Sequence, residues 1–193
     1  MSAEISDILI TEGDLRTRVA ELAAEINQDY ADRPVVLVGI LKGAFIFLAD
    51  LCRQLTIPVS FDFMAVSSYG SGTKSCGVVR ILKDLDTDIT GKDVIIIEDI
   101  IDSGLTLNYL HKSLRARQPA SLEICSLIRK PETDKVHLET KYVGFSIPNE
   151  FVVGYGLDYA QQFRNLPYVA RLRVERKNDS KTVVASRTAT ARR

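Results

Sequence analysis

The chain has 193 residues, of which 46% are hydrophobic and 26% are charged. This composition is typical of one globular domain with a substantial apolar core, and it excludes a chain that is disordered throughout. Lys and Arg together number 25, and so do Asp and Glu, so the net charge gives no reason to expect a nucleic-acid partner.

The cysteines and the N-terminal residues indicate the compartment. Cys52, Cys76 and Cys125 are far apart and lack a Cys-x-x-Cys spacing, so they predict neither a zinc site nor a redox pair. Residues 1–10 carry acidic side chains where a signal peptide needs basic ones, and no segment approaches membrane-spanning length. We therefore expect a soluble, cytoplasmic protein without a membrane partner.

The first half of the chain alternates between helical and extended patterns. Apolar residues at helical spacing predict an amphipathic helix over 15–26. The apolar, β-branched run at 35–40 predicts a strand buried on both faces, and a helix is expected over 44–55. Alternation of apolar and polar residues then predicts a strand over 59–65.

The second half continues the alternation. A fully apolar run at 94–97 predicts another buried strand, a helix is expected over 105–116, and a further apolar strand over 122–128. Strands joined by such long crossovers pair in parallel. The order therefore predicts an α/β fold with a mainly parallel sheet flanked by helices.

Two polar stretches interrupt this pattern. Residues 67–77 read SSYGSGTKSCG, which is too polar for the core and too long for a tight turn, so we expect a mobile lid. Residues 176–193 have little apolar content and several basic side chains, and a disordered tail is expected there. The expected organisation is one domain over 1–175 followed by this tail.

Residues 94–106, VIIIEDIIDSGLT, hold the most informative motif. The apolar strand delivers Glu98 and Asp99 to its carboxyl end, the edge at which open α/β sheets bind ligands. The small residues that follow open a helix, and backbone N–H groups at a helix N-terminus can hold a phosphate. The candidate phosphate-binding residues are Ser103, Gly104, Leu105 and Thr106. Taken singly, these pieces also fit a plain helix cap and a solvated strand end.

Taken together and in this order, the apolar run, the acid pair and the Asp-Ser-Gly-x-Thr segment resemble the phosphoribosyl-pyrophosphate-binding motif of the type I phosphoribosyltransferases. The resemblance implies that Glu98 and Asp99 face ribose hydroxyls and Mg²⁺. It also implies that Asp102 lies beside N7 of a purine, where a carboxylate can accept the ring proton as the catalytic base. A cap for the following helix is the alternative role of Asp102.

Two further segments are similar to parts of the same family. Lys42 and Gly43 match a loop that exposes backbone donors to pyrophosphate, often through a cis peptide before the position of Lys42. In isolation, Lys-Gly is an ordinary strand-to-helix turn. Ser68 and Tyr69 resemble a Ser-Tyr pair that closes over the active site and excludes water.

The string FVVGYGLDY, with Lys-Pro upstream and an arginine downstream, narrows the resemblance to the hypoxanthine-guanine branch. The resemblance implies that Phe151 stacks on the purine and that Lys130 donates to its 6-oxo group. Main-chain groups near Val152 and Asp158 would read the far edge of the base, and the Asp158 carboxylate would help to hold a second Mg²⁺. Arg164 would contact pyrophosphate. Each of these residues alone also fits a core strand, a solvated lysine or a surface ion pair.

The resemblance extends from Leu9 to about Arg173. It implies a type I phosphoribosyltransferase fold with a small hood subdomain beside the parallel sheet. The implied activity converts hypoxanthine or guanine and phosphoribosyl pyrophosphate to IMP or GMP and pyrophosphate, with Mg²⁺ as cofactor. A homodimer or homotetramer is implied as well.

Two rival interpretations stay open. The first is a nucleotide-sensing regulator built on the same fold, but such proteins usually add a DNA-binding domain or a basic surface, for which this chain has neither the room nor the charge. The second is an enzyme acting on pyrimidines or orotate, which conflicts with Lys130 and the FVVGYGLDY string.

Overall fold

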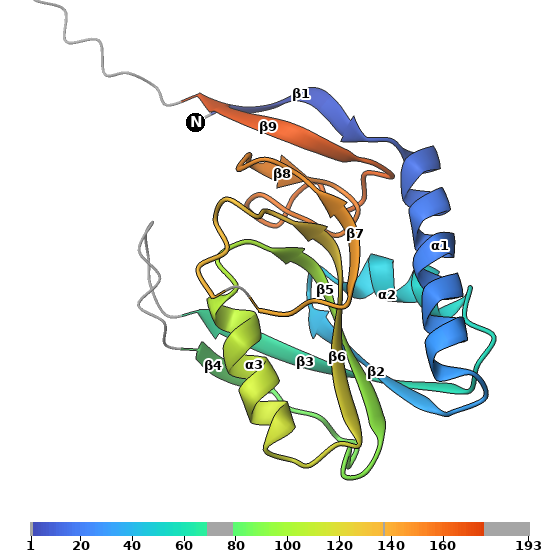
Figure 1. The fold of residues 1–193 in the computed structure, drawn as a ribbon. Coiled ribbons are helices and arrows are strands. Elements are labelled where there is room, and N and C mark those ends of the chain that lie inside the picture. The colour runs from blue at the N-terminus through green and yellow to red at the C-terminus, as the bar shows by residue number, and fades with distance from the viewer. Residues whose placement is uncertain (1, 69–78, 137, 176–193) are drawn as a thin grey trace, which may run out of the picture.

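The computed structural model describes residues 2–68, 79–136 and 138–175. Its main sheet has six strands in the order β4-β3-β2-β5-β6-β7, and a second sheet has three in the order β1-β9-β8 (Figure 1). The main sheet comprises β2 (Val35–Leu41), β3 (Val59–Ser68), β4 (Val79–Lys83), β5 (Asp93–Ile101), β6 (Ser121–Arg129) and β7 (Tyr142–Ser146). The second comprises β1 (Ser2–Ile10), β8 (Val152–Val153) and β9 (Val169–Glu175).

The expected α/β class with a mainly parallel sheet is confirmed. Every neighbouring pair in the main sheet is parallel except β3 with β4. The helices α1 (Glu12–Tyr30) and α2 (Phe45–Cys52) cover one face of the sheet, and α3 (Leu105–Arg115) covers the other (Figure 1). The second sheet stands beyond the carboxyl ends of the parallel strands, as the expected hood would.

Strand β5 shows why continuous apolar runs predict the centre of this sheet. Ile95 and Ile97 pack in the core cluster that includes α1 and α2, whereas Val94 and Ile96 pack in the cluster that includes α3. All four side chains are fully buried. Because both faces are covered, the middle of β5 consists of apolar residues alone.

Three helix boundaries differ from the prediction by more than one residue, and one of them is the end of α1, which lies at Tyr30 rather than at residue 26. Helix α1 begins before residue 15 because Thr11 forms a capping box with Asp14, in which the Thr11 side chain accepts from the Asp14 N–H at 3.2 Å. Helix α2 ends at Cys52 rather than at residue 55. Beyond the helix, the Thr56 N–H donates to Asn27 Oδ1 of α1 at 2.9 Å.

The strands β1, β4, β7 and β9 were not expected from the sequence. Strands β1 and β9 pair in antiparallel fashion, with Ser2 opposite Glu175 and Ile10 opposite Val169. Strand β9 in turn pairs with β8, where Val152 lies opposite Arg171. The two ends of the described chain therefore hold the segment that contains Phe151.

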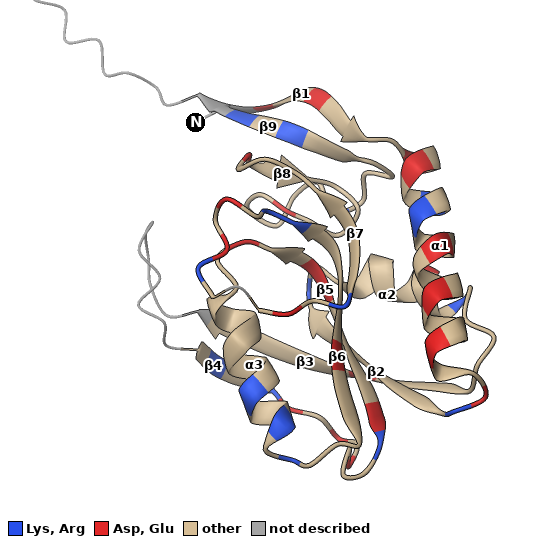
Figure 2. Ribbon diagram, in the orientation of Figure 1, with Lys and Arg blue, Asp and Glu red and all other residues tan. Residues whose placement is uncertain are grey.

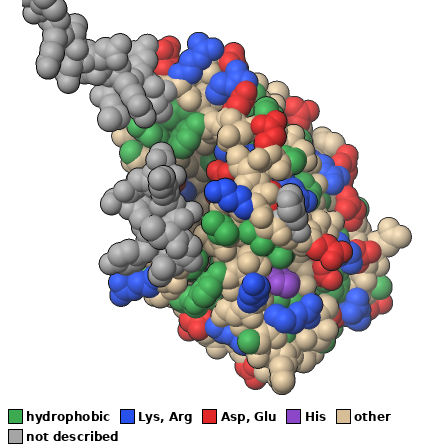
Figure 3. Space-filling view, turned by 60° about the vertical axis from the view of Figure 1, so that its left-hand side comes forward, with side chains coloured by type: hydrophobic (Ala, Val, Ile, Leu, Met, Phe, Trp, Pro, Cys, Tyr) green, Lys and Arg blue, Asp and Glu red, His purple; other side chains and the backbone are tan. Residues whose placement is uncertain are grey.

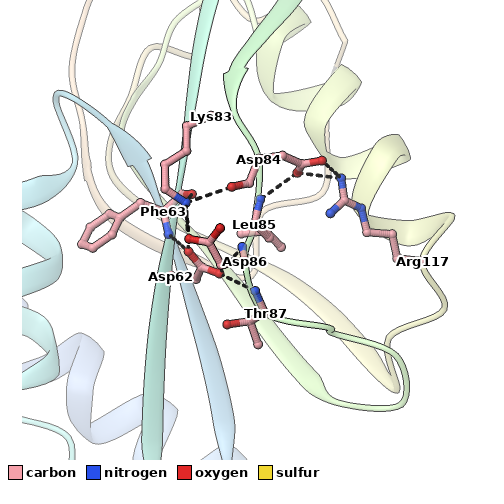
Figure 4. Close-up of polar contacts among 8 residues, drawn as sticks. All are labelled: Asp62, Phe63, Lys83, Asp84, Leu85, Asp86, Thr87 and Arg117. Atoms are coloured by element: carbon pink, nitrogen blue, oxygen red, sulfur yellow. Dashed lines mark hydrogen bonds and ion pairs between the residues drawn. The ribbon is translucent and has the colours of Figure 1, made fainter.

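A buried carboxylate fastens the loop after β4 to the main sheet (Figure 4). Asp62 accepts from the N–H groups of Phe63, Asp86 and Thr87 at 2.7, 2.9 and 2.8 Å, and from Lys83 Nζ at 3.4 Å. Burial by itself would raise the pKa of Asp62, but these donors hold it at about 2. The carboxylate is therefore the stable form in the folded protein.

The expected lid over 67–77 lies outside the described residues except at its first two positions, and the expected tail over 176–193 lies outside them completely. Tyr69 and Cys76 are also outside them. Within the described part of the chain, no helix combines the length and the apolar character that a bilayer crossing requires.

Candidate active site

A cleft of about 250 Å³ lies between the carboxyl end of β5 and the segment that begins with β8. Figure 2 shows acidic residues on the upper part of β5, toward this edge of the sheet. The cleft brings together residues that are more than 50 positions apart in sequence. Its lining consists of Asp99, Ile100, Asp102, Lys130, Phe151, Val152, Leu157 and Asp158.

The loop from Ser103 to Thr106 forms the start of α3. Gly104 is the N-cap residue with φ 71°, a left-handed conformation that glycine adopts without strain. Gly104 has no side chain with which to cap the helix, so among the described residues the first-turn N–H groups remain available to an anion. Below the loop, a Cβ on Gly104 would approach Asp134 Oδ1 to 3.0 Å, and Arg129 Nη2 pairs with Asp134 Oδ2 at 2.7 Å.

Lys130 and Asp102 form an ion pair across the floor of the cleft. Lys130 follows β6 directly, and its N–H donates to the carbonyl of Ile101 at 2.9 Å. Lys130 Nζ lies 3.6 Å from Asp102 Oδ2. The lysine side chain is buried, whereas that of Asp102 is exposed. The pair therefore presents a buried cation and an open carboxylate on one side of the cleft.

Phe151 also lines the cleft and is 51% exposed. Its ring lies perpendicular to that of Tyr159, with ring centroids 5.7 Å apart. Its carbonyl accepts from the Leu172 N–H at 2.9 Å, and the neighbouring Glu150 binds Arg171 through two hydrogen bonds of 2.6 Å. Strand β9 thus holds an exposed aromatic ring at the mouth of the cleft.

The turn that follows β8 carries Asp158 and Arg164. Arg164 Nη2 pairs with Asp158 Oδ1 at 2.6 Å, and Asp158 Oδ2 accepts from the Gln161 N–H at 2.8 Å. Lys42 Nζ reaches this turn and donates to Gln161 Oε1 at 3.3 Å. Lys42 and Arg164 are thus joined to one polar cluster through Gln161 and Asp158.

Two glycines allow three segments to pack closely here. The peptide between Leu41 and Lys42 is cis, and Gly43 follows it. A Cβ on Gly43 would collide with the Asp99 carboxylate, and a Cβ on Gly156 would collide with the Gly43 carbonyl oxygen. The end of β5, the loop after β2 and the turn after β8 are therefore stacked against one another.

Glu98 and Asp99, the two acidic residues near the end of β5, both have raised pKa values. Burial raises the pKa of Asp99 to about 6, although the Ile100 N–H and Arg164 oppose this shift. Burial, and then the charge of Asp99, raise the pKa of Glu98 well above its usual range. Among the described residues, Glu98 Oε2 is buried without a hydrogen-bond partner. This end of the strand therefore favours a cation or a hydroxyl donor.

The expected metal ligands Glu98, Asp99 and Asp158 do not form a ready-made metal cluster in the described part of the chain. The donor set still fits Mg²⁺, which commonly binds one or two carboxylates together with the phosphate oxygens of a substrate. The orphaned oxygen of Glu98 and the nearby Asp99 supply such carboxylates.

The structure thus brings most of the expected site residues to one edge of the sheet. Ser68 is the last residue of β3, and Tyr69 lies outside the described residues. Sequence reasoning missed Gln161, which accepts from Lys42, and Tyr155, which donates to Asp50 on the helix that follows Gly43. The glycines on both sides of Tyr155 were the available signal, because they mark a tight turn in which the central side chain has a fixed direction.

The phosphoribosyl transferase domain family matches residues 10–160 of the chain. The hypoxanthine-guanine phosphoribosyltransferase of Mycobacterium avium is 51% identical over 175 residues, which cover 88% of this chain and 86% of that protein. The hypoxanthine phosphoribosyltransferase of Salmonella typhimurium is 52% identical over 168 residues, covering 86% and 94%. A solved hypoxanthine-guanine phosphoribosyltransferase structure from Bacillus anthracis is similar with a TM-score of 0.84 and 46% identity, over 90% of this chain and all of that one.

Proposed function

Because the chain belongs to the phosphoribosyl transferase family, in its hypoxanthine-guanine branch, we propose that it joins hypoxanthine or guanine to the ribose of phosphoribosyl pyrophosphate. The products are IMP or GMP and pyrophosphate. The reaction is a pentosyl transfer that serves purine salvage.

The pairing of Lys130 with Asp102 is the observation that carries this proposal. An ammonium can only donate and a carboxylate can only accept, and the two lie 3.6 Å apart in one cleft. A 6-oxopurine presents O6 and N7 side by side on one edge. When N7 carries its proton, the base offers an acceptor to Lys130 and a donor to Asp102, whereas the amino group of adenine opposes Lys130.

Phe151 supports a planar ligand in the same cleft. Its ring is exposed, and it is held from behind by Tyr159 and by the pairing of β8 with β9. A purine that enters the cleft can stack on this ring while its edge meets Lys130. Main-chain groups at Val152 and Asp158 lie in the same lining and are assigned to the far edge of the base.

The phosphoribosyl pyrophosphate is assigned to the remaining polar groups. The N–H groups and hydroxyls from Ser103 to Thr106 suit the 5′-phosphate, because they open α3 without a side-chain cap. The loop containing Lys42 and Gly43 lies beside the turn of Arg164, which supports a diphosphate between them. Glu98 and Asp99, at the end of β5, are assigned to the ribose hydroxyls.

The transfer follows from these positions. N9 of the base attacks carbon 1 of the ribose, the bond from that carbon to pyrophosphate breaks, and the bonding electron pair leaves with the diphosphate. Asp102 accepts the N7 proton as N9 attacks, while Lys130 donates to O6 and holds the base in register. Positive charge develops on the ribose ring as in glycoside cleavage, and the ionised carboxylate of Asp99 beside the ribose favours this state.

Mg²⁺ is included in the proposal. Glu98, Asp99 and Asp158 are the residues that would hold it together with substrate oxygens, and the buried, unpartnered oxygen of Glu98 supports this. The ion would supply neutralisation of the charge on the departing diphosphate.

We also propose a homodimer or homotetramer in the cytoplasm. Large apolar side chains are exposed on neighbouring elements: Phe45 on α2 by 43%, Phe61 on β3 by 60% and Leu82 on β4 by 60%. A second copy of the chain could cover them. The free thiols of Cys52 and Cys125 support a reducing compartment. A monomer in light scattering at micromolar concentration would contradict the assembly.

The rival function, a nucleotide-sensing regulator, receives less support from the surface. On the face drawn in Figure 3, the described Lys and Arg side chains lie among acidic ones. A regulator that binds nucleic acid is expected to gather basic residues into a stripe or patch.

Pyrophosphate release, measured with hypoxanthine, guanine, xanthine, adenine and uracil in the presence of Mg²⁺, tests the proposal. Hypoxanthine and guanine should be substrates, and adenine and uracil should be very poor ones. Nucleotide binding without turnover of any base would favour the regulator instead.

A further inference from the structure

Tyr155 occupies the centre of the turn that follows β8. It has φ 50° between Gly154 at 102° and Gly156 at 101°, and its N–H donates to the Leu166 carbonyl at 2.9 Å. Glycine adopts left-handed conformations readily, but a tyrosine there is strained. The turn therefore holds this side chain in one direction against a local preference, which points to a role for the side chain.

The tyrosine hydroxyl reaches a residue more than 100 positions away. The Tyr155 side chain is buried, and its Oη donates to Asp50 Oδ2 on α2 at 2.7 Å. Burial raises the pKa of Tyr155 above its usual value, and the hydrogen bond to Asp50 raises it further. The phenol is therefore a constant donor under physiological conditions.

Helix α2 transmits this contact to the pyrophosphate loop. The helix follows Lys42 and Gly43 almost directly, and its first turn is anchored by the bond from the Leu48 N–H to the Ala44 carbonyl at 2.8 Å. Gly156, next to Tyr155, packs against the Gly43 carbonyl oxygen. The turn therefore meets the loop directly through the backbone at Gly156, and it meets the helix that follows the loop through the Tyr155 side chain.

The same turn holds the groups assigned to the other side of the diphosphate. Arg164 Nη1 donates to the Gly156 carbonyl at 2.6 Å, and Arg164 Nη2 pairs with Asp158. A shift of Gly156 would move Arg164 with it. The position of the turn against α2 thus sets the spacing between Lys42 and Arg164.

Tyr155 packs in the core cluster that includes α1 and α2, but it also borders a cavity. Tyr155 and Asp50 both line a cavity of about 550 Å³ between α1, α2 and residues 165–167. Because this cavity leaves space beside the pair, the hydrogen bond is the specific contact between the turn and the helix at this point.

We infer that Tyr155 and Asp50 are positioning residues, whose hydrogen bond fixes the Lys42–Gly43 loop against the turn that carries Asp158 and Arg164. The inference rests on the proposed function for the identity of the diphosphate. The base contacts depend less on this bond, because Phe151 is held by β9 and Lys130 follows β6.

The test compares Tyr155→Phe with Tyr142→Phe in the full chain. Tyr142 is a matched control, since its buried Oη also donates to an aspartate, Asp29 Oδ2 at 2.7 Å, between β7 and α1. Both variants should lower the melting temperature. Only Tyr155→Phe should raise the KM for phosphoribosyl pyrophosphate, by about 10-fold, while the KM for hypoxanthine changes by less than about 2-fold.

Variants at Asp50 distinguish the hydrogen bond from general packing. Asp50→Asn keeps an acceptor oxygen and should retain a KM near the wild-type value, whereas Asp50→Ala should behave like Tyr155→Phe. The double variant Tyr155→Phe with Asp50→Ala should be no worse than Asp50→Ala alone, because one bond is lost in each. A wild-type KM in Tyr155→Phe, or additive effects in the double variant, would overturn the inference.

The positioning role of Tyr155 can be tested even if the proposed enzymatic activity is absent. If the wild-type chain turns over no oxopurine, the inference is still tested by inorganic pyrophosphate with Mg²⁺ in thermal shift. Pyrophosphate should then stabilise Tyr142→Phe as much as wild type, and Tyr155→Phe less. Equal stabilisation of both tyrosine variants would overturn it.

Discussion

Lys130 Nζ lies 3.6 Å from Asp102 Oδ2, although the lysine follows β6 and the aspartate follows β5. Only 7% of the lysine side chain is exposed, against 58% of the aspartate side chain. A buried ammonium needs an opposite charge or acceptors close by. Asp102 therefore supplies the charge partner of Lys130 in the absence of a base. A base that binds between them has to offer an acceptor to Lys130 and a donor to Asp102.

Replacing Lys130 with Gln should lower kcat/KM for hypoxanthine and guanine by about 10- to 100-fold, because a charge-assisted donor is lost. The preference over adenine should fall as well, since a rotatable amide can present either a donor or an acceptor. The KM for phosphoribosyl pyrophosphate should barely change. Lys141→Gln is the control, because Lys141 pairs with Asp29 away from the cleft. Unchanged constants for both oxopurines in Lys130→Gln would remove this lysine from the base pocket.

Replacing Asp102 with Asn should lower the turnover number by roughly 10²-fold or more, because the amide keeps the shape but accepts a proton poorly. The affinity for phosphoribosyl pyrophosphate should stay close to that of the wild type. Rapid-quench measurement of nucleotide formation separates the chemical step from product release. Near-normal turnover would leave Asp102 as no more than the ion-pair partner of Lys130, because among the described residues the structure shows no side-chain cap at the start of α3.

The carboxylate of Asp62 should make folding stability depend on acid pH. Its pKa is about 2 in the folded protein, below the ordinary value of 3.8, so its contribution is fully present above pH 4 and is lost as the pH falls toward 2. Asp62→Asn should lower the free energy of unfolding at pH 7 by about 2–3 kcal/mol, since one donor-bound oxygen becomes a donor. The melting temperature should fall by roughly 5–10 °C.

The exposed Asp86 provides the control for that change, because its side chain also pairs with Lys83 but is 87% exposed. Asp86→Asn should leave the melting temperature within about 2 °C of wild type. The difference between wild type and Asp62→Asn should shrink between pH 6 and pH 2.5. A difference that stays constant over this range would mean that burial or shape, rather than the ionised carboxylate, gives Asp62 its effect.

Local sequence patterns could predict the centre of this fold and the position of the candidate phosphate-binding loop, because β5 and the start of α3 are formed by nearly consecutive residues. The apolar run at 94–97 needs no distant partner to be recognised as a buried strand. The contacts of Tyr155 with Asp50 and of Lys42 with Gln161 could not be predicted in this way, since each joins residues more than 100 positions apart. The capping box of Thr11 and Asp14 is visible in the sequence and would have corrected the start of α1.

Gly43→Ala should lower the activity strongly, although the substitution adds only one methyl group. The added Cβ would collide with the Asp99 carboxylate, so either the loop or the end of β5 must move. Displacement of about 1 Å at a reacting centre costs on the order of 10²-fold in rate, and we expect a loss of that size in kcat/KM for phosphoribosyl pyrophosphate.

Gly13→Ala is the matched control, because Gly13 lies in α1 and the nearest atom to its added Cβ is Thr11 Oγ1 at 3.7 Å. Alanine favours a helix, so this control should keep full activity and be as stable as wild type or slightly more so. Steady-state kinetics and thermal melting of both variants check the contrast. Wild-type kinetics in Gly43→Ala would show that the loop can retreat from Asp99 without effect on the diphosphate site.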